Sequence, residues 1–311
     1  MTSVSRVARR IRTRDTPPRT VREFIELAAR QLRIGKVVFA HGTTDPVAEA
    51  AFLVGETLGV APHWIERSLG SPVTPAQGRK ILALIERRIS TRKPAAYLVG
   101  RIYMRGVPFT IDERAIVPRS FLGEVIDGDL FDDRGSPLLG DPTAIRNVLD
   151  LCTGSGCLAI LAARRFPRAS VDAVDISEDA LALARTNVAA HNLNRRVRLL
   201  HGDLFEPVRT ARYDLIIANP PYVDAAGMKS LPPECRHEPR LALAGGADGL
   251  AVIQRILEQA GPHLTDRGGL LCEVGRGRER LERAYPNKSF LWLDTEDSSG
   301  EVFWLDASQL R

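Results

Sequence analysis

The spacing of apolar residues changes twice along the chain. Between residues 20 and 93 apolar side chains recur every three or four positions, which predicts amphipathic helices. Between 97 and 117 they recur at shorter spacing and are interrupted by Gly100 and Gly106, which predicts a β-hairpin. From Asn147 onward short apolar runs alternate with helical patterns. This alternation predicts an α/β domain built on a parallel sheet.

Three helices are predicted in the first region from the signals at which they begin. Thr20 and Glu23 have the spacing of a capping box. Asp45 and Thr74 each precede a proline, as residues at a helix start do. We expect the apolar faces of the first and third helices to be formed by Val21, Phe24, Ile25, Ala28 and Leu32 and by Ile81, Leu82, Ile85 and Ile89. Periodicity leaves the role of this small domain open between a lid, a surface that docks a partner, and packing for stability alone.

The order of these patterns predicts the domain organisation. We expect an Arg-rich tail, a helical substrate-recognition domain, a β-hairpin with its linker, a loop rich in Gly, Asp and Pro, and the α/β domain, at 1–19, 20–93, 94–127, 128–144 and 145–311. Near the end of the chain the apolar runs predict a fifth strand and a closing antiparallel pair, at 270–274, 290–293 and 302–305. Glu273 in the fifth strand could support the site or be a strand-end acid with no role.

The first two strands of the α/β domain end in groups suited to a nucleoside. The strand at 148–151 runs into a tight glycine loop, where the backbone can approach a ligand closely at a helix N-terminus. This loop contains Gly154, Ser155 and Gly156. The strand at 169–174 ends at Asp175, whose carboxylate is placed to accept hydrogen bonds from both ribose hydroxyls.

The third strand, at 197–200, leads to Asp203 and Leu204, and Asp203 is placed to accept a hydrogen bond from an adenine amine. Each of these signals is weak alone. The glycine pattern that continues to Ala159 also fits a nicotinamide-dinucleotide site, Asp175 also fits a helix cap, and Asp203 also fits a turn.

The fourth strand, at 213–218, delivers Asn219-Pro220-Pro221-Tyr222 to the carboxyl end of the sheet, where open α/β sheets bind ligands. The Asn219 side-chain oxygen and the Pro220 carbonyl can accept two hydrogen bonds from one –NH2 group, and Tyr222 can stack on it. Gripping both hydrogens aims the nitrogen lone pair at an electrophile, which is catalysis by positioning and electrostatics. The alternative is a proline-capped strand end with a turn tyrosine.

The order of the four strand ends favours one interpretation. A glycine loop, two acids and the Asn-Pro-Pro-Tyr loop together describe a nucleoside pocket that faces an amide clamp. The electrophile that suits such a pocket is S-adenosylmethionine, which carries an activated methyl group and, unlike a dinucleotide, no pyrophosphate.

Composition narrows the function classes. The chain has 311 residues, of which 44% are hydrophobic and 26% charged, as in ordinary globular proteins of about two domains. Residues 1–22 hold seven arginines and one aspartate, so they carry +6 and leave −1 for the rest of a chain whose formal charge is +5. A body this neutral lacks the basic footprint of a protein that grips nucleic acid throughout. The tail is expected to be a disordered extension, with an RNA contact and an Arg-rich transit peptide as alternatives.

The sequence contains no recognisable metal-binding motif and no segment typical of a membrane-spanning helix. The four cysteines form no CxxC pair and the six histidines form no HExxH motif, so we expect reduced thiols, no metal site and a cytosolic protein. No apolar stretch approaches the ~20 residues that a spanning helix needs.

The chain resembles the HemK-type N5-glutamine methyltransferases over about residues 20–306. In that family the Asn-Pro-Pro-Tyr loop binds the substrate glutamine, while the glycine loop and the two acids bind S-adenosylmethionine. The resemblance therefore implies a Rossmann-like class I methyltransferase fold. It assigns catalysis to Asn219, Pro220, Pro221 and Tyr222, and cofactor binding to Gly154, Ser155, Gly156, Asp175, Asp203, Leu204 and Asn219.

Two branches of the family modify either ribosomal protein L-three or peptide-release factors. Val117-Pro118-Arg119-Ser120 is similar to the ribosomal-protein (PrmB-like) branch, whereas the release-factor branch continues Pro-Arg with Asp-Thr-Glu. Further matches to the ribosomal-protein branch are His41-Gly42-Thr43 with Pro46 and Glu49, Trp292-Leu293, and Gly300-Glu301-Val302-Phe303. The resemblance thus implies N5-methylation of a glutamine in ribosomal protein L-three. Release-factor methylation is the nearest alternative, followed by adenine-N6 methylation and by a ribosome-assembly factor that only binds S-adenosylmethionine.

Overall fold

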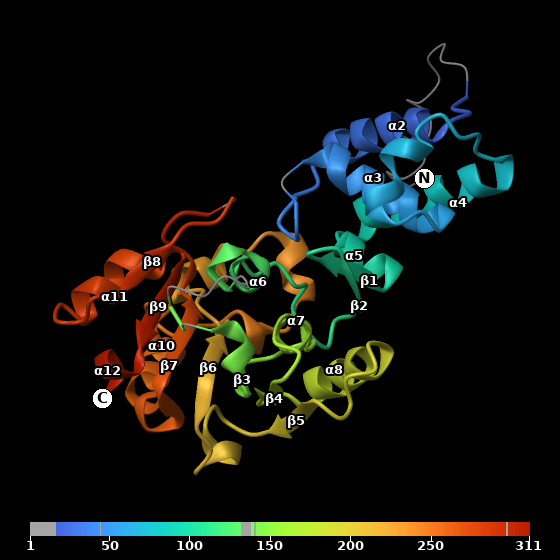
Figure 1. Cartoon of the computed structure of the whole chain (residues 1–311). Coiled ribbons are helices and arrows are strands. Elements are labelled where there is room, and N and C mark those ends of the chain that lie inside the picture. Colours follow the sequence, from blue (N-terminus) through green and yellow to red (C-terminus); the bar gives the residue numbers. More distant parts are fainter. Residues whose placement is uncertain (1–16, 44, 132–137, 140, 297) are drawn as a thin grey trace. The chain divides into compact units, whose positions relative to one another are not determined.

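The computed structural model describes residues 17–43, 45–131, 138–139, 141–296 and 298–311 (Figure 1). Most of the predicted Arg-rich tail and part of the predicted loop at 128–144 lie outside these residues. The chain divides into two compact units. One runs up to Val37 and resumes over Asp45–Thr91, and the other contains Val38–Thr44 and Arg92–Arg311.

The first unit is helical. Its α-helices are α2 (Val21–Ile34), α3 (Pro46–Leu58) and α4 (Pro75–Thr91), with two 3-10 turns at Pro62–Trp64 and Glu66–Ser68. The capping box predicted at Thr20 is present, and Asp45 accepts hydrogen bonds from the first turn of α3. The predicted apolar face of α2 is buried. On α4 Ile81 and Ile85 are buried, but the expectation for Leu82 is wrong, because its side chain is 37% exposed on the outer face.

The second unit begins with a short helix and the predicted hairpin. The elements are α5 (Ala95–Val99), β1 (Arg101–Met104), β2 (Val107–Thr110) and α6 (Leu122–Asp127). The hairpin is confirmed over a narrower range than predicted, since Tyr97 and Val99 lie in α5. Tyr97 is buried there and donates a hydrogen bond to the Ala115 carbonyl at 2.5 Å, and α5 ends at its C-cap residue Gly100, which has φ 72°.

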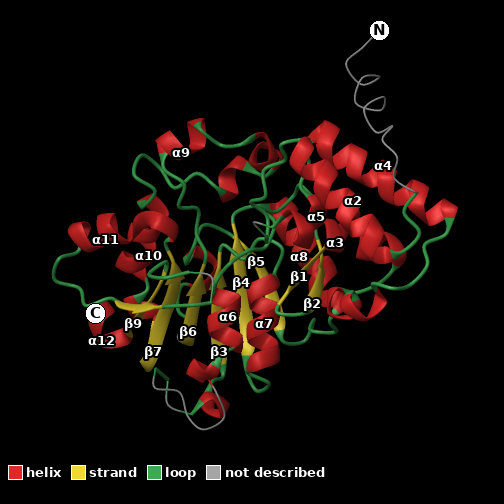
Figure 2. Cartoon of the chain, turned by 90° about the horizontal axis from the view of Figure 1, so that it is seen from above, coloured by secondary structure: helices red, strands yellow, loops and turns green. Residues whose placement is uncertain are grey.

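The main sheet has seven strands in the order β5-β4-β3-β6-β7-β9-β8 (Figure 2). Its strands are β3 (Asn147–Leu151), β4 (Ser170–Asp175), β5 (Val197–His201), β6 (Tyr213–Ala218), β7 (Leu264–Glu273), β8 (Leu291–Leu293) and β9 (Val302–Asp306). The first five in this row are parallel, and β9 and β8 close the edge antiparallel, as the sequence predicts. This is the predicted Rossmann-like α/β fold.

Helices cover both faces of the sheet. The remaining helices are α7 (Cys157–Arg165), α8 (Glu178–Ala190), α9 (Ala225–Lys229), α10 (Ala251–Gln259), α11 (Arg278–Ala284) and α12 (Ala307–Leu310). Alternation along each strand divides the core into two clusters: Val148 and Leu215 pack with α6, α7 and α8, whereas Leu149 and Ile216 pack with α10, α11 and α12.

The register brings the strand ends together. Leu151 pairs with both Val174 and Ala218, and Ala218 pairs in turn with Cys272. The loops that follow β3, β4, β5 and β6 therefore leave the sheet at one edge, next to the last residue of β7.

A buried ion pair supplies a test of the helical unit. Arg88 Nε on α4 donates to Glu49 Oε1 on α3 at 2.8 Å, and both side chains are buried. We expect Glu49→Gln to lower the free energy of unfolding by about 3 kcal/mol, because it removes the negative charge that Glu49 presents to the buried guanidinium. Urea unfolding of the full chain measures this. Glu86→Gln, at an exposed position of α4, is the control, and an equally small effect of both changes would contradict the prediction.

Candidate active site

The Asn219-Pro220-Pro221-Tyr222 loop begins directly after β6. Pro220 is buried and Asn219 is half-buried. Among the described residues no group forms a hydrogen bond with the Asn219 side-chain amide. A polar group that is held in place and left without a partner is ready to bind a ligand.

Close contacts with glycines fix the backbone and ring of Tyr222. Gly249 has φ +84°, and a Cβ atom on it would lie 2.4 Å from the Tyr222 carbonyl oxygen. Gly275 has φ +51°, and a Cβ atom there would lie 2.6 Å from the Tyr222 ring. Both positions require glycine for space as well as for conformation. The two glycines thus define where the loop lies.

Glu273, the last residue of β7, holds the Tyr222 hydroxyl. Tyr222 donates to Glu273 Oε1 at 2.9 Å, and the Ser120 hydroxyl and Phe121 N–H donate to Oε2 at 2.6 and 3.0 Å. Burial raises the pKa of Glu273 despite these three donors. The sequence left this acid open between a supporting role and none. The structure shows that it links the Asn-Pro-Pro-Tyr loop to the segment that contains Val117–Ser120.

The glycine loop is shaped by two carboxylates. The buried Asp150 side chain accepts from the Thr153 hydroxyl at 2.5 Å and from the Ala159 N–H at 3.0 Å. Asp175 accepts from the N–H groups of Gly154 and Ser177, at 2.8 and 2.9 Å. Both oxygens of Asp175 keep a further lone pair for a ligand. The alternative of a helix cap does not hold for Asp175, because Ser177 is the N-cap of α8 and accepts from the Ala180 N–H.

The charges around the glycine loop are negative. The partly buried Cys152 thiol has a raised pKa, because of desolvation and then of Asp175, Asp150 and Asp203. A negative field of this kind suits a cation better than a pyrophosphate. It therefore favours the sulfonium of S-adenosylmethionine over a nicotinamide dinucleotide.

Asp203 has a partner that the sequence did not reveal. Arg255 on α10 donates to Asp203 Oδ2 at 2.8 Å, and roughly half of the arginine side chain is exposed. One carboxylate oxygen of Asp203 thus faces Arg255, and among the described residues no group donates a hydrogen bond to the other. Leu204, which follows with φ +50°, buries its side chain in the core beneath α10.

One cavity joins the two halves of the predicted site. Its wall includes the predicted residues Gly154, Ser155, Asn219, Pro220 and Tyr222. It also includes Val117–Ser120, Cys152, Ala242 and Leu243. The predicted residues Gly156, Asp175, Asp203, Leu204 and Pro221 do not line this cavity. A Cβ atom on Gly154 would meet nothing within 4 Å, so space for a cofactor lies beside the glycine loop.

Two supporting residues escaped the sequence analysis. Asp150 is an acid in an otherwise apolar strand, directly before the glycine loop, and this position was the available signal. Arg255 gave no such signal, because 52 residues separate it from its partner Asp203.

Two family models match different parts of the chain, and several named relatives match nearly all of it. The family model described as methyltransferase small domain matches residues 132–231, and the model described as PrmC N-terminal domain matches residues 35–100. A ribosomal protein uL3 glutamine methyltransferase from Bradyrhizobium diazoefficiens is 58% identical over 94% of this chain and 92% of its own length. Proteins of the same name from Burkholderia pseudomallei and Bordetella pertussis are 46% and 45% identical, over 96% and 94% of this chain and 98% and 96% of their own lengths.

Asp150 makes stability depend on pH. Burial raises its pKa to about 7 from the ordinary value of 3.8, outweighing the hydrogen bonds from Thr153 and Ala159 that lower it. The protonated carboxyl therefore contributes stability below about pH 4, and this contribution is lost as the pH rises to about 7. Asp150→Asn cannot ionise at this position. We therefore expect its free energy of unfolding, relative to that of the native protein, to rise by on the order of 4 kcal/mol between pH 4 and pH 8.

Urea unfolding at both pH values measures this difference. Asp179→Asn, at an exposed carboxylate in the first turn of α8, is the matched control and should show no such gain. A difference between Asp150→Asn and the native protein that does not change with pH would contradict the prediction.

Proposed function

The chain belongs to the family of ribosomal protein uL3 glutamine methyltransferases, and we propose that it transfers a methyl group from S-adenosylmethionine to the side-chain nitrogen of one glutamine in ribosomal protein uL3. The observation that carries this proposal is the unpaired Asn219 amide, which lines one cavity together with the glycine loop. An amide clamp and a site for a cationic methyl donor are the two parts that this reaction requires.

The clamp residues prepare the nitrogen for attack. The Asn219 side-chain oxygen and the Pro220 carbonyl accept the two amide hydrogens of the glutamine, so the nitrogen lone pair points across the cavity. Tyr222, fixed by Glu273, packs against the amide plane, and Pro221 keeps the loop rigid. When bound, S-adenosylmethionine supplies an electrophilic methyl carbon on its sulfonium.

The proposed methyl transfer needs no strong base to remove a proton from the glutamine nitrogen before attack. The new N–C bond forms as the S–C bond breaks, which leaves S-adenosylhomocysteine. Methylation makes the nitrogen acidic, and one proton then leaves it for water. The loop therefore acts by orientation and by stabilising the hydrogens that become more positive during attack.

The cofactor would be held by the glycine loop, of which Gly154 and Ser155 line the cavity, and by Asp175 and Asp203, which lie outside the cavity wall. Asp175 accepts the ribose hydroxyls with its remaining lone pairs, and Asp203 accepts the adenine amine with the oxygen that does not face Arg255. Gly154, Ser155 and Gly156 let the backbone approach the cofactor, and Leu204 holds Asp203 in position. These assignments rest on the hydrogen bonds and charges described above.

We propose the cytoplasm as the compartment, because the substrate of the relatives is a ribosomal protein and the four cysteines are free thiols. Among the described residues no helix is long and apolar enough to cross a membrane.

Label transfer tests the substrate. Methyl-labelled S-adenosylmethionine is incubated with the protein and either purified uL3 or a purified peptide-release factor, and the products are mapped by peptide mass. We expect label on a single glutamine of uL3 and none on the release factor. Label on the release factor alone would overturn the substrate assignment, and label on neither would overturn the proposed function.

Asn219→Ala tests the clamp. We expect kcat to fall by about a hundredfold or more, because the amide hydrogens lose an acceptor that acts in the transition state, while the Kd for S-adenosylmethionine stays unchanged. Steady-state kinetics and calorimetric titration measure the two quantities. Asn194→Ala, at an exposed turn position, is the control. Equal losses in turnover and in cofactor affinity would contradict the role of Asn219.

A further inference from the structure

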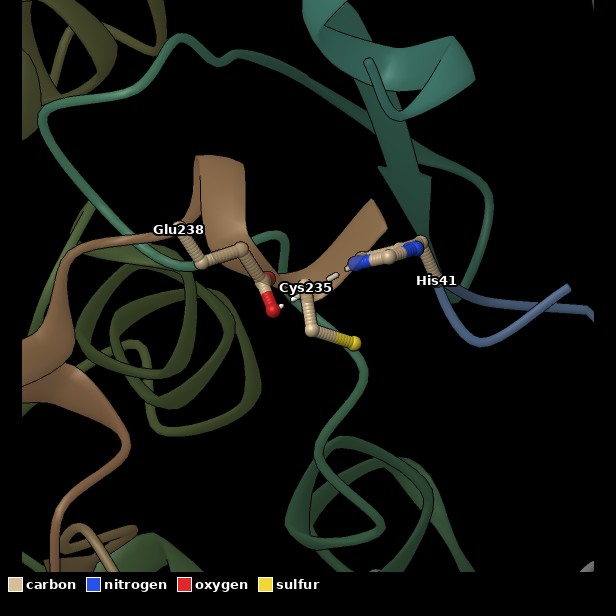
Figure 3. A group of neighbouring side chains, drawn as sticks. All are labelled: His41, Cys235 and Glu238. Carbon is tan, nitrogen blue, oxygen red and sulfur yellow. Dashed lines mark ion pairs between the residues drawn. The ribbon is translucent and has the colours of Figure 1, made fainter. Parts of the chain in front are cut away.

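A buried cluster lies under the loop that follows the Asn-Pro-Pro-Tyr motif. His41, Cys235 and Glu238 converge there, from a segment early in the chain and from a 3-10 turn at Pro233–His237 (Figure 3). All three belong to the second unit of the chain. Neither the predicted site nor the proposed reaction uses them.

Glu238 is the centre of this cluster. Its Oε1 accepts from the Val117 N–H at 3.0 Å and from Arg119 at 2.6 Å, and its Oε2 accepts from Arg119 at 2.9 Å. His41 Nε2 lies 3.3 Å from Oε2, and the carboxylate is fully buried. The two-pronged contact with Arg119 is the strong geometry for an arginine–carboxylate pair.

The spacing of the three side chains would also fit a metal ion, since their ligand atoms lie within 4.8 Å of one another. The charges oppose this reading. Glu238 already faces the fixed cation Arg119, and burial raises the pKa of Cys235, which disfavours the thiolate that binds metal. Burial alone would raise the pKa of Glu238, but the hydrogen bonds and charges of His41 and Arg119 hold it at about 2. The anion is thus balanced by the protein itself.

A second buried acid fixes the same loop one turn earlier. Glu234 Oε1 accepts from the Val38 N–H at 3.1 Å and from Arg92 at 3.3 Å, and its side chain is also fully buried. The loop is therefore held to residues more than one hundred positions away in the chain, through carboxylates that cannot be left unpaired without a large cost.

The loop leads from Glu238 to the cavity. A 3-10 turn at Arg240–Ala242 follows it, and Ala242 and Leu243 line the cavity wall. The Leu243 carbonyl accepts from the Val223 N–H at 2.9 Å, directly after the Asn-Pro-Pro-Tyr motif. Arg119, the partner of Glu238, lines the same cavity. One carboxylate therefore controls two separate parts of the wall that faces the protein substrate.

We propose that Glu238, held by His41, is a positioning residue for methyl transfer that sets Arg119 and the Ala242–Leu243 wall against the incoming polypeptide. Glu238 acts through these neighbours and does not touch the reacting atoms. This inference rests on the proposed function and goes beyond it, because it assigns the recognition of the substrate backbone and its flanking residues to a wall separate from the amide clamp.

Glu238→Gln and His41→Ala test the proposal in the full-length protein. We expect each to lower kcat/KM for uL3 about tenfold or more, chiefly through KM, while the Kd for S-adenosylmethionine stays within about twofold of the native value. The double variant should lose less than the two single variants predict together, because both changes break one network. His41→Gln, which keeps a side-chain donor, should recover part of the loss. Glu279→Gln, at an exposed position of α11, is the matched control.

Hydrogen exchange separates this test from the test of the proposed function. We expect the backbone amides of residues 240–245 to exchange faster in Glu238→Gln than in the native protein, whether or not uL3 is the substrate. Native kcat/KM in Glu238→Gln, unchanged exchange, or a parallel loss of cofactor affinity would each overturn the proposal. Stoichiometric Zn²⁺ in the purified protein, lost in His41→Ala, would also overturn it in favour of a metal site. Absence of turnover by the native protein would overturn the proposed reaction. The hydrogen-exchange rates would then still show whether Glu238 fixes the loop.

Discussion

The site depends on carboxylates that are buried and must therefore be supplied with hydrogen-bond donors. Asp150, Glu273 and Glu238 lie at or beyond the carboxyl edge of the sheet, and each is less than 4% exposed. A buried carboxylate without partners would cost several kcal/mol, so each one selects its neighbours. Asp150 accepts hydrogen bonds from the glycine loop and from α7. Glu273 accepts from both Tyr222 and Ser120, and Glu238 forms an ion pair with Arg119. The backbone segments that form the cavity are thus placed by acids that need not touch a ligand.

The same acids decide which chemistry the site can host. With Asp150, Asp175 and Asp203 around Cys152, the field at the glycine loop attracts positive charge. Protonation of Asp150 near neutral pH moderates this field without changing the loop geometry, because Thr153 and Ala159 donate to the carboxyl in either state. The glycine spacing fits both a dinucleotide and S-adenosylmethionine, and the negative charge around the loop favours the sulfonium over a pyrophosphate.

Sequence patterns predicted what depends on local chemistry. Helix starts at Thr20 and Asp45 follow from side chains that cap the next turn, and the strand ends at Asp175 and Asn219 follow from apolar runs that stop at polar residues. The failures have one cause. The burial of Tyr97 in a helix, the pairing of Asp203 with Arg255 and the contact of Glu238 with His41 depend on residues brought together only by the fold. Pattern carries no information on such long-range pairs, so these partners could not be predicted, whereas the proposed amide clamp is one stretch of four residues that the sequence shows directly.

Asn219 differs from the residues around it, because its side chain has no hydrogen-bond partner among the described residues. Its neighbours Tyr222, Ser120 and Arg119 are all engaged with buried acids. Leaving a half-buried amide unpaired opposes folding, and the loop tolerates it because Gly249 and Gly275 pack against Tyr222 closely enough to hold the backbone. An amide fixed in this way loses little entropy when it binds a ligand. In the proposed reaction, the free energy that folding gives up at Asn219 is recovered when the substrate amide binds.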